Sequence, residues 1–221
     1  MVIHDKRQQL SMTRILIAED HEVVRSGLRR LLESQAKWEV VGEASDGKEA
    51  VAKALELKPD IAVLDYALPL LNGIEVTRQI RARQPRTEVL IFTMHDNETL
   101  ISDLLAAGAR GFLLKSDASR FLLAAIDSLT LHKPFFTAKV SETLLDSYLK
   151  RPSHAQSALT ARERGVVQLI AEGHSNKQIA NVLNISVKTV ETHRSAVMRK
   201  LNVSSSASLV RYAIRNEIIQ A

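Results

Sequence analysis

Short apolar runs alternate with amphipathic stretches through residues 13–131, and this pattern predicts a succession of strands and helices. The clearest run is IAVL at residues 61–64, and such a run is typical of a strand that is buried on both faces. Strands are expected at residues 13–18, 38–44, 61–64, 89–93 and 111–114, and helices at 47–57, 72–83, 98–107 and 119–131. An additional helix after the first strand is expected to turn five apolar residues inward, namely Val23, Val24, Leu28, Leu31 and Leu32.

Five strands that alternate with five helices predict an α/β fold with a doubly wound, five-stranded parallel sheet. In the flavodoxin-like strand order 2-1-3-4-5, the first and third strands are neighbours, and ligands bind beyond the carboxyl ends of the strands. We therefore expect residues 13–131 to form one domain, preceded by a mobile leader at residues 1–12.

The pattern is wholly helical from residue 158 onward. Thr160 and Glu163 have the spacing of a capping box, and Gly173 is expected to end the helix that they begin. Ser175 and Ser186 are expected to cap helices at 176–183 and 187–201, and the short turn between these helices predicts a helix-turn-helix. Residues 158–221 are thus predicted to be a second, all-helical domain, joined to the first by a linker at 132–157 with a probable helix at 137–150.

Charge is distributed unevenly between the two predicted domains. Residues 1–132 carry 17 Lys and Arg against 19 Asp and Glu, whereas residues 133–221 carry 13 against 6. A basic second domain favours a polyanionic partner such as nucleic acid, although small domains also differ this much by chance. The chain has no cysteine, which excludes disulfides and thiolate metal sites. Its first residues are polar and charged, without an apolar stretch of signal-peptide length, and no long apolar run follows. We expect a cytoplasmic protein without a membrane partner.

Ionisable and polar side chains stand at the carboxyl ends of four predicted strands. Glu19 and Asp20 follow the first strand, Asp65 follows the third, Thr93 ends the fourth, and Lys115 follows the fifth. Each has an ordinary alternative, because a strand-end Asp often caps the next helix and a strand-end Lys is usually solvated. Their convergence at one edge of the sheet instead predicts a site where acids bind Mg²⁺ beside a phosphoryl group.

These residues, together with LDYALPLLNG around Asp65 and the pair Lys115-Ser116, resemble the receiver domain of bacterial two-component response regulators. The resemblance implies that Asp65 is the phosphoacceptor. It implies that Mg²⁺ is bound by Glu19, Asp20, Asp65 and the backbone carbonyl of Ala67. Thr93 and Lys115 would then sense the phosphoryl group, and Phe112 would be the aromatic residue that moves with Thr93. Two positions depart from many receivers, namely Ser116, where proline is common, and Met94, where a smaller residue is common.

The second helix of a helix-turn-helix enters the major groove of DNA with its amino-terminal part leading. Its predicted solvent face carries Lys188, Glu191, Thr192 and Arg194, whereas Asn176 and Lys177 on the preceding helix are better placed for the DNA backbone. The alternative is a small helical bundle whose basic face serves only solubility.

The blocks LTARE, SNKQIA, ISVKTVETH and KL make residues 158–219 similar to the LuxR-type helix-turn-helix of NarL/FixJ-type response regulators. The resemblance implies four helices, the last at 206–216 and often dimer-forming, and two copies bound to inverted half-sites of double-stranded DNA. It implies DNA contacts through Lys188, Thr192 and Arg194, while His193 either touches phosphate or packs against the protein.

Taken together, the two resemblances predict a response regulator that is a transcription factor and not an enzyme. A sensor histidine kinase would phosphorylate Asp65, the active form would be a homodimer, and RNA polymerase is a further expected partner. One alternative keeps DNA binding but makes the first domain a docking platform for a partner protein. Another is a flavodoxin-like or phosphatase-like enzyme. The absence of a glycine-rich loop after the first strand, and Ala67 where an aspartyl phosphatase needs a second acid, disfavour the enzyme.

Overall fold

The protein is described by a computed structural model that covers residues 12–95, 98–138, 140–142, 145, 159–216 and 218–219. The predicted leader lies outside these residues except for Met12. The predicted linker helix at 137–150 also lies mostly outside them.

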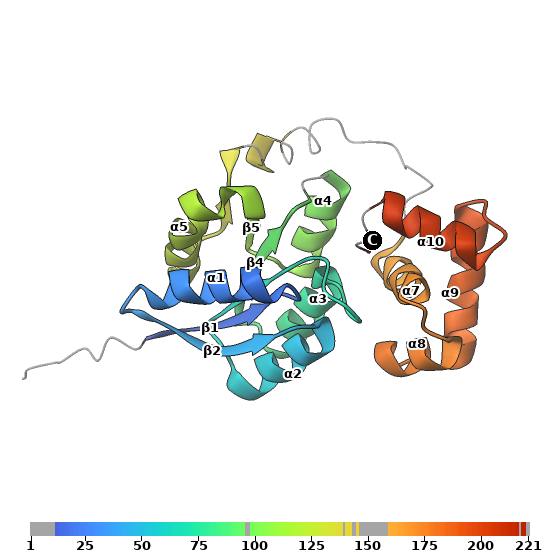
Figure 1. The fold of residues 1–221 in the computed structure, drawn as a ribbon, viewed down its shortest axis with the longest axis horizontal. Coiled ribbons are helices and arrows are strands. Elements are labelled where there is room, and N and C mark those ends of the chain that lie inside the picture. The colour runs from blue at the N-terminus through green and yellow to red at the C-terminus, as the bar shows by residue number, and fades with distance from the viewer. Residues whose placement is uncertain are drawn as a thin grey trace, which may run out of the picture.

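The first part of the chain forms one parallel sheet in the order β2-β1-β3-β4-β5-β6 (Figure 1). The predicted α/β fold and the order of its first five strands are confirmed. The sixth strand was not predicted, because only two residues form it, immediately after Pro134. The strands are β1 (Thr13–Ala18), β2 (Trp38–Ala44), β3 (Ile61–Leu64), β4 (Glu88–Thr93), β5 (Gly111–Leu114) and β6 (Phe135–Phe136).

Helices cover both faces of this sheet, because alternate residues of each strand point to opposite sides. Ile15 and Ile17 of β1 pack in one buried cluster with α1 and α5, whereas Leu16 and Ala18 belong to the other cluster, with α2, α3 and α4. The helices are α1 (Glu22–Glu33), α2 (Gly47–Leu57), α3 (Gly73–Arg83), α4 (Glu98–Ala107) and α5 (Ala118–Thr130), and a 3-10 turn, Lys115–Asp117, precedes α5.

The expected inner stripe of α1 is partly wrong. Leu28 and Leu32 are buried, but Val23 is 86% exposed and Leu31 is 44% exposed. A separation of five residues turns a side chain by about 140° around a helix, so Val23 cannot share a face with Leu28. The buried stripe of α1 is therefore narrower than its apolar composition indicated.

The second part of the chain is a helical unit whose predicted caps are confirmed. Thr160 and Glu163 form the capping box of the first helix, and Ser175 and Ser186 accept hydrogen bonds at the starts of the next two. Gly173 ends the first helix with a φ of 87°. The helices are α7 (Ala161–Ala171), α8 (Asn176–Leu183), α9 (Val187–Lys200) and α10 (Ser206–Arg215).

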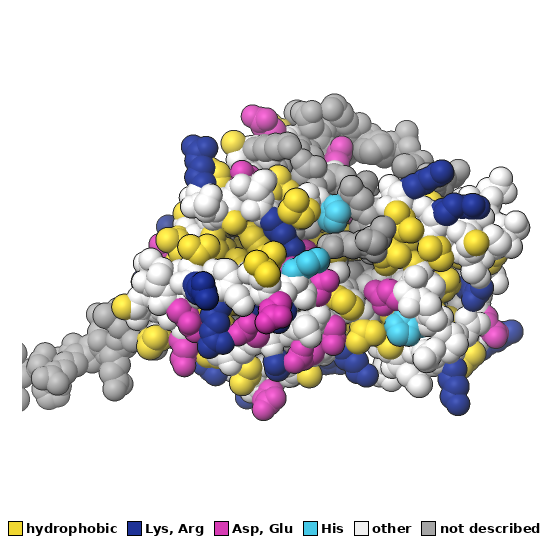
Figure 2. Space-filling view, viewed as in Figure 1, with side chains coloured by type: hydrophobic (Ala, Val, Ile, Leu, Met, Phe, Trp, Pro, Cys, Tyr) yellow, Lys and Arg dark blue, Asp and Glu magenta, His cyan; other side chains and the backbone are white. Residues whose placement is uncertain are grey.

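The helical unit meets the α/β part through α7, which packs against α3. Helix α9 stands on the side of the helical unit that is remote from the sheet (Figure 1). Figure 2 shows Asp and Glu side chains gathered over α1, β2 and α2, and Lys and Arg side chains at the outer edges of the helical unit. Within the described residues, no helix has both the length and the apolar character needed to span a bilayer.

Candidate phosphorylation site and nucleic-acid interface

The carboxyl ends of β1 and β3 place two acids side by side. The parallel register pairs Ala18 with Leu64, and the amide of Asp65 donates to the carbonyl of Ala18 at 2.8 Å. The next residue of each strand is an acid, so Glu19 and Asp65 leave the sheet together. Glu19 is fully buried and Asp65 is 2% exposed. Two neighbouring buried carboxylates repel each other unless a cation or a proton offsets part of their charge.

Lys115 supplies a cation from the end of β5. Its Nζ lies 2.9 Å from Oδ2 of Asp65 and 2.7 Å from Oε2 of Glu19. Burial disfavours the charged ammonium, but Asp65 and Glu19 together outweigh this effect and raise the pKa of Lys115. Lys115 therefore stays charged and bridges both acids.

Within this cluster, burial disfavours the ionised form of Glu19. Burial, together with the charge of Asp65, raises the pKa of its carboxyl group, although Lys115 and the backbone amide of His21 act in the opposite direction. Among the described residues, its buried Oε2 has the ammonium of Lys115, at 2.7 Å, as its one polar neighbour. An oxygen left in this state has lone pairs available to a metal ion.

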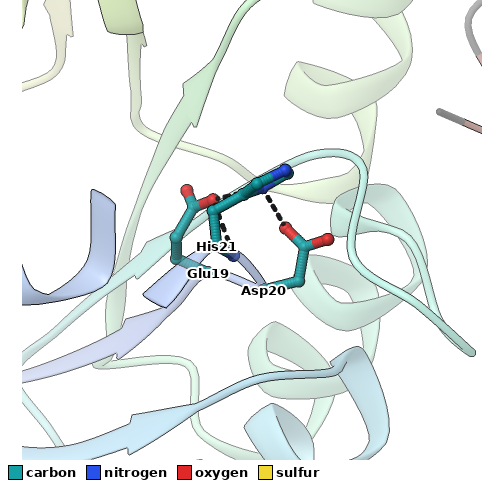
Figure 3. Close-up of side chains that lie close together, drawn as sticks. All are labelled: Glu19, Asp20 and His21. Carbon is teal, nitrogen blue, oxygen red and sulfur yellow. Dashed lines mark hydrogen bonds and ion pairs between the residues drawn. The ribbon is translucent and has the colours of Figure 1, made fainter. Parts of the chain in front are cut away.

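His21 joins the acid cluster, a contact that the sequence reading missed. Its Nδ1 lies 2.9 Å from Oδ1 of Asp20 and 3.2 Å from Oε1 of Glu19, and Figure 3 shows the imidazole between the two carboxylates. Arg25 of α1 donates to the backbone carbonyl of Glu19 at 2.7 Å and so holds the turn in place. The position of His21 directly after Glu19-Asp20 is the one feature of the sequence that indicates this contact.

The oxygen-rich donor set suits a hard cation. Glu19, Asp20 and His21 offer ligand atoms within 4.8 Å of one another, and the side chain of Asp20 is 28% exposed. Asp20 and Ala67 line the same cleft of about 280 Å³, and Asp65 adjoins Glu19 through the strand register. Mg²⁺ prefers one or two carboxylates with further oxygen ligands and keeps several waters, which a partly open cleft permits.

Thr93 and Phe112 lie where the sheet topology predicts. Thr93 ends β4 fully buried, and its Oγ1 accepts a hydrogen bond from the amide of His95 at 3.3 Å. Phe112 is 1% exposed on β5 and belongs to the cluster that packs beneath α2, α3 and α4. Of the two departures, Met94 is 65% exposed, and Ser116 lies in the 3-10 turn after β5.

The predicted helix-turn-helix is α8 and α9, joined through Asn184. Asn184 adopts a left-handed conformation, with a φ of 54°, and its amide caps α8 by donating to the carbonyl of Ala180. Val190 and Val197 are fully buried on the inner side of α9. The opposite side of α9 is therefore its solvent face.

The predicted DNA-contact residues differ in their present surroundings. Lys188 and Thr192 are exposed on α9, and Lys177 is exposed near the start of α8. Arg194 is half-buried and donates to Asn176 at 3.3 Å and to Ser206 at 2.7 Å, so it ties α9 to α8 and α10. His193 is also half-buried. The most accessible of these side chains are Lys177, Lys188 and Thr192.

An acid cluster and a bridging lysine at the carboxyl edge of a parallel α/β sheet, on one chain with a helix-turn-helix, define the class of response regulators. Residues 15–127 match the response regulator receiver domain, and residues 157–213 match the bacterial regulatory proteins of the luxR family. The chain belongs to this family of response regulators, which are transcription regulators with a LuxR-type helix-turn-helix. The resemblance predicted from the sequence is thereby confirmed.

Curated relatives align with almost the whole chain. The oxygen regulatory protein NreC of Staphylococcus epidermidis (strain ATCC 12228) is 36% identical over 216 residues, which cover 94% of this chain and 99% of NreC. NreC of Staphylococcus aureus (strain NCTC 8325) is 35% identical over 215 residues, with the same shares covered.

Solved structures give the same picture of the fold. RcsB from Salmonella enterica serovar Typhimurium, bound to promoter rprA in the presence of the phosphomimetic BeF3-, has a TM-score of 0.67 and 28% identity, covering 91% of this chain and 98% of that one. A LuxR-family response regulator from Aurantimonas sp. SI85-9A1 has a TM-score of 0.60 and 35% identity, covering 63% of this chain and 99% of that one.

Proposed function

We propose that this transcription regulator is switched by phosphorylation of Asp65, with a sensor histidine kinase as donor and Mg²⁺ as cofactor. The observation that carries the proposal is the buried ion-pair cluster in which Lys115 bridges Asp65 and Glu19 at 2.9 and 2.7 Å. A buried cluster of this kind has little value for stability alone, because desolvation offsets most of the attraction. Its position at the carboxyl edge of the sheet suits phosphoryl chemistry.

In the proposed reaction, a carboxylate oxygen of Asp65 attacks the phosphorus of the donor, and the bond between phosphorus and the donor's leaving group breaks. The leaving group keeps the electron pair, and Asp65 becomes an acyl phosphate. Glu19, Asp20, Asp65 and the carbonyl of Ala67 would hold Mg²⁺, which neutralises charge that develops on the phosphoryl oxygens. The ammonium of Lys115 would move from the unphosphorylated carboxylate of Asp65 to a phosphoryl oxygen. Its raised pKa keeps it protonated for that role.

The phosphorylated residue would then act on Thr93 and Phe112. A hydroxyl donor at the end of β4 turns toward the new phosphoryl oxygens, and the space that it vacates accommodates the ring of Phe112. The surface formed by α4, β5 and α5 changes with these two side chains. We expect dimerisation to follow, and a homodimer seats two copies of α9 on inverted half-sites of double-stranded DNA, with far higher affinity than one copy.

On the DNA, Lys188, Thr192 and Arg194 would face the major groove, Asn176 and Lys177 would face the phosphates, and His193 either touches phosphate or packs. The exposure of Lys177, Lys188 and Thr192 supports this assignment, and the similar protein RcsB has been solved in complex with DNA. RNA polymerase is a further proposed partner. The predicted boundaries at 13–131 and 158–221 remain the proposed domains, and a cytoplasmic location remains a prediction.

The direct test is intact mass spectrometry after incubation with a small acyl phosphate. The parent chain should gain the mass of one phosphoryl group when Mg²⁺ is present and should gain none when a chelator replaces Mg²⁺. Asp65→Asn should gain none under either condition, whereas Asp60→Asn, at the opposite edge of the sheet, should behave like the parent. Equal labelling of Asp65→Asn and the parent would overturn the proposal.

A further inference from the structure

Two side chains at the end of helix α7 of the DNA-binding unit form hydrogen bonds with the loop between β3 and α3. Nε2 of Gln168 donates to the backbone carbonyl of Leu68 at 2.8 Å, and Gln168 is 2% exposed. The carboxylate of Glu172, directly after α7, accepts from the amide of Leu70 at 3.3 Å and from Nε2 of Gln168 at 2.8 Å. A buried glutamine and a half-buried glutamate of one unit thus bind two backbone groups of the other.

The loop between β3 and α3 is part of the proposed phosphorylation site. It begins directly after Asp65 and includes Ala67, whose carbonyl is a proposed metal ligand. Leu70 within it adopts a left-handed conformation, with a φ of 66°, which is sterically unfavourable for a residue that carries a Cβ. Such strain persists only where surrounding contacts enforce it. The bond to Glu172 is one of these contacts, so the conformation of the loop and the docking of α7 depend on each other.

The docked helix also forms one wall of the cleft that leads to the acid cluster. Asp20, Ala67 and Pro69 line one side of this 280 Å³ cleft, and Gln168, Ala171 and Glu172 line the other. An anionic phosphodonor that enters this way passes the carboxylate of Glu172 as well as that of Asp20. The docked unit therefore narrows the entrance and adds a like charge to it.

Two further ion pairs join α7 to the α/β part. Arg162 lies 3.6 Å from Glu75 of α3, and Arg164 lies 3.7 Å from Asp103 of α4. Helix α9, the second helix of the helix-turn-helix, makes none of these four contacts and lies on the side of the helical unit that is remote from the sheet (Figure 1). Docking in this arrangement thus acts on the phosphorylation site and leaves the DNA-reading face uncovered.

We propose that Gln168 and Glu172 form a latch by which the DNA-binding unit slows phosphoryl transfer to Asp65. While the latch is closed, the loop cannot adjust its Ala67 carbonyl, and Glu172 repels the donor. When it opens, the loop is free and the cleft is wide. The latch rests on the proposed function, since it presumes that Asp65 is the acceptor.

The test measures the rate at which the full-length chain is phosphorylated by a small acyl phosphate with saturating Mg²⁺. Gln168→Ala with Glu172→Gln should react about tenfold faster than the parent, because one interdomain hydrogen bond and one like charge are removed and the bond from Leu70 loses its charged acceptor. The matched control is Gln35→Ala with Glu56→Gln, which makes the same two changes away from α7 and should react at the parent rate. A latch variant that reacts at the parent rate, or more slowly, overturns the proposal.

A charge exchange provides the second measurement. Asp103→Arg faces Arg164 with a like charge and should also accelerate phosphorylation, whereas Asp103→Arg combined with Arg164→Asp should restore the slow rate. A double variant as fast as the single one contradicts the latch. A parent chain that is never phosphorylated refutes the proposed function itself, whereas a parent that reacts at the same rate as all variants refutes only the latch.

Discussion

The ammonium of Lys115 reaches across the end of β4 and lies 2.9 Å from the carboxylate of Asp65, a residue fifty positions earlier in the chain. The same ammonium contacts Glu19, so a single positive charge separates two buried acids. Removal of this charge leaves the two carboxylates facing each other in a site that water scarcely reaches. The consequence is measurable without any phosphodonor.

Lys115→Met should lower the free energy of unfolding by about 3 kcal/mol, the usual penalty when one partner of a buried ion pair is removed. Chemical denaturation at neutral pH measures it. Lys37→Met is the matched control, because Lys37 pairs with Asp127 at the surface and both side chains are about half exposed. The control should lose less than about 1 kcal/mol. Similar losses in the two variants would mean that the Lys115 cluster is no more buried than a surface pair.

The ion pair between Glu163 and Lys200, at 2.7 Å, should give the helical unit a pH-dependent stability. Burial opposes ionisation of Glu163, but Lys200 and Thr160 outweigh it and lower the pKa of Glu163 below 4.5. A lowered folded pKa means that the stabilisation is present above the glutamate pKa of the unfolded chain and is lost as the pH falls through the folded value. The advantage of the parent over Glu163→Gln in thermal unfolding should therefore shrink on acidification.

Glu191→Gln serves as the control for this pH series, because Glu191 is exposed on α9. It should track the parent at every pH. A constant gap between the parent and Glu163→Gln down to strongly acidic pH would show that the Lys200 pair does not control the stability of this unit.

The left-handed Asn184 in the helix-turn-helix should tolerate glycine better than alanine. A Cβ costs about 1 kcal/mol in this conformation when the side chain offers no compensating local hydrogen bond, so Asn184→Ala should lower the thermal midpoint. Asn184→Gly removes the Cβ and should stay close to the parent. If glycine proved as harmful as alanine, the backbone conformation of the turn would not be the reason for asparagine there.

Lys188→Ala should weaken DNA binding and reduce its dependence on salt. If Lys188 contacts a phosphate, the slope of log affinity against log salt falls by about one unit, and the loss is similar for all sequences. If it contacts a base, the loss is confined to the preferred sequence. Lys58→Ala, an exposed lysine of the α/β part, is the control and should change neither quantity. Unchanged affinity and slope in Lys188→Ala would remove this residue from the interface.

The sequence predicted the sheet well because its signals are local and repeated. Each buried strand is a short apolar run, and the polar residue that ends it marks the carboxyl edge, as Asp65 and Lys115 illustrate. The strand Phe135–Phe136 escaped prediction because two residues have no periodicity. Val23 is exposed although it is apolar, because helix geometry turns its side chain about 140° away from that of Leu28, a relation that apolar composition alone does not reveal.

The contacts between the α/β part and the helical unit are not marked by any sequence pattern as clear as the apolar runs of the strands. Gln168 interrupts the apolar run of α7, and a polar residue inside such a run was the one available hint. Its partner is a backbone carbonyl one hundred positions away, and no pattern of side chains specifies such a bond. His21 was overlooked for a different reason, since its neighbours Glu19 and Asp20 already accounted for the site.

The central claim is that phosphorylation of Asp65 controls DNA binding, and operator affinity measures it most directly. A duplex selected by the parent from a random library would be titrated with the parent and with Asp65→Asn, each with Mg²⁺ and an acyl phosphate, at one stated salt concentration. We predict that the phosphodonor tightens binding by the parent at least about tenfold, with a shift from monomer to dimer, and leaves Asp65→Asn unchanged. Equal tightening in the two proteins would contradict control through Asp65.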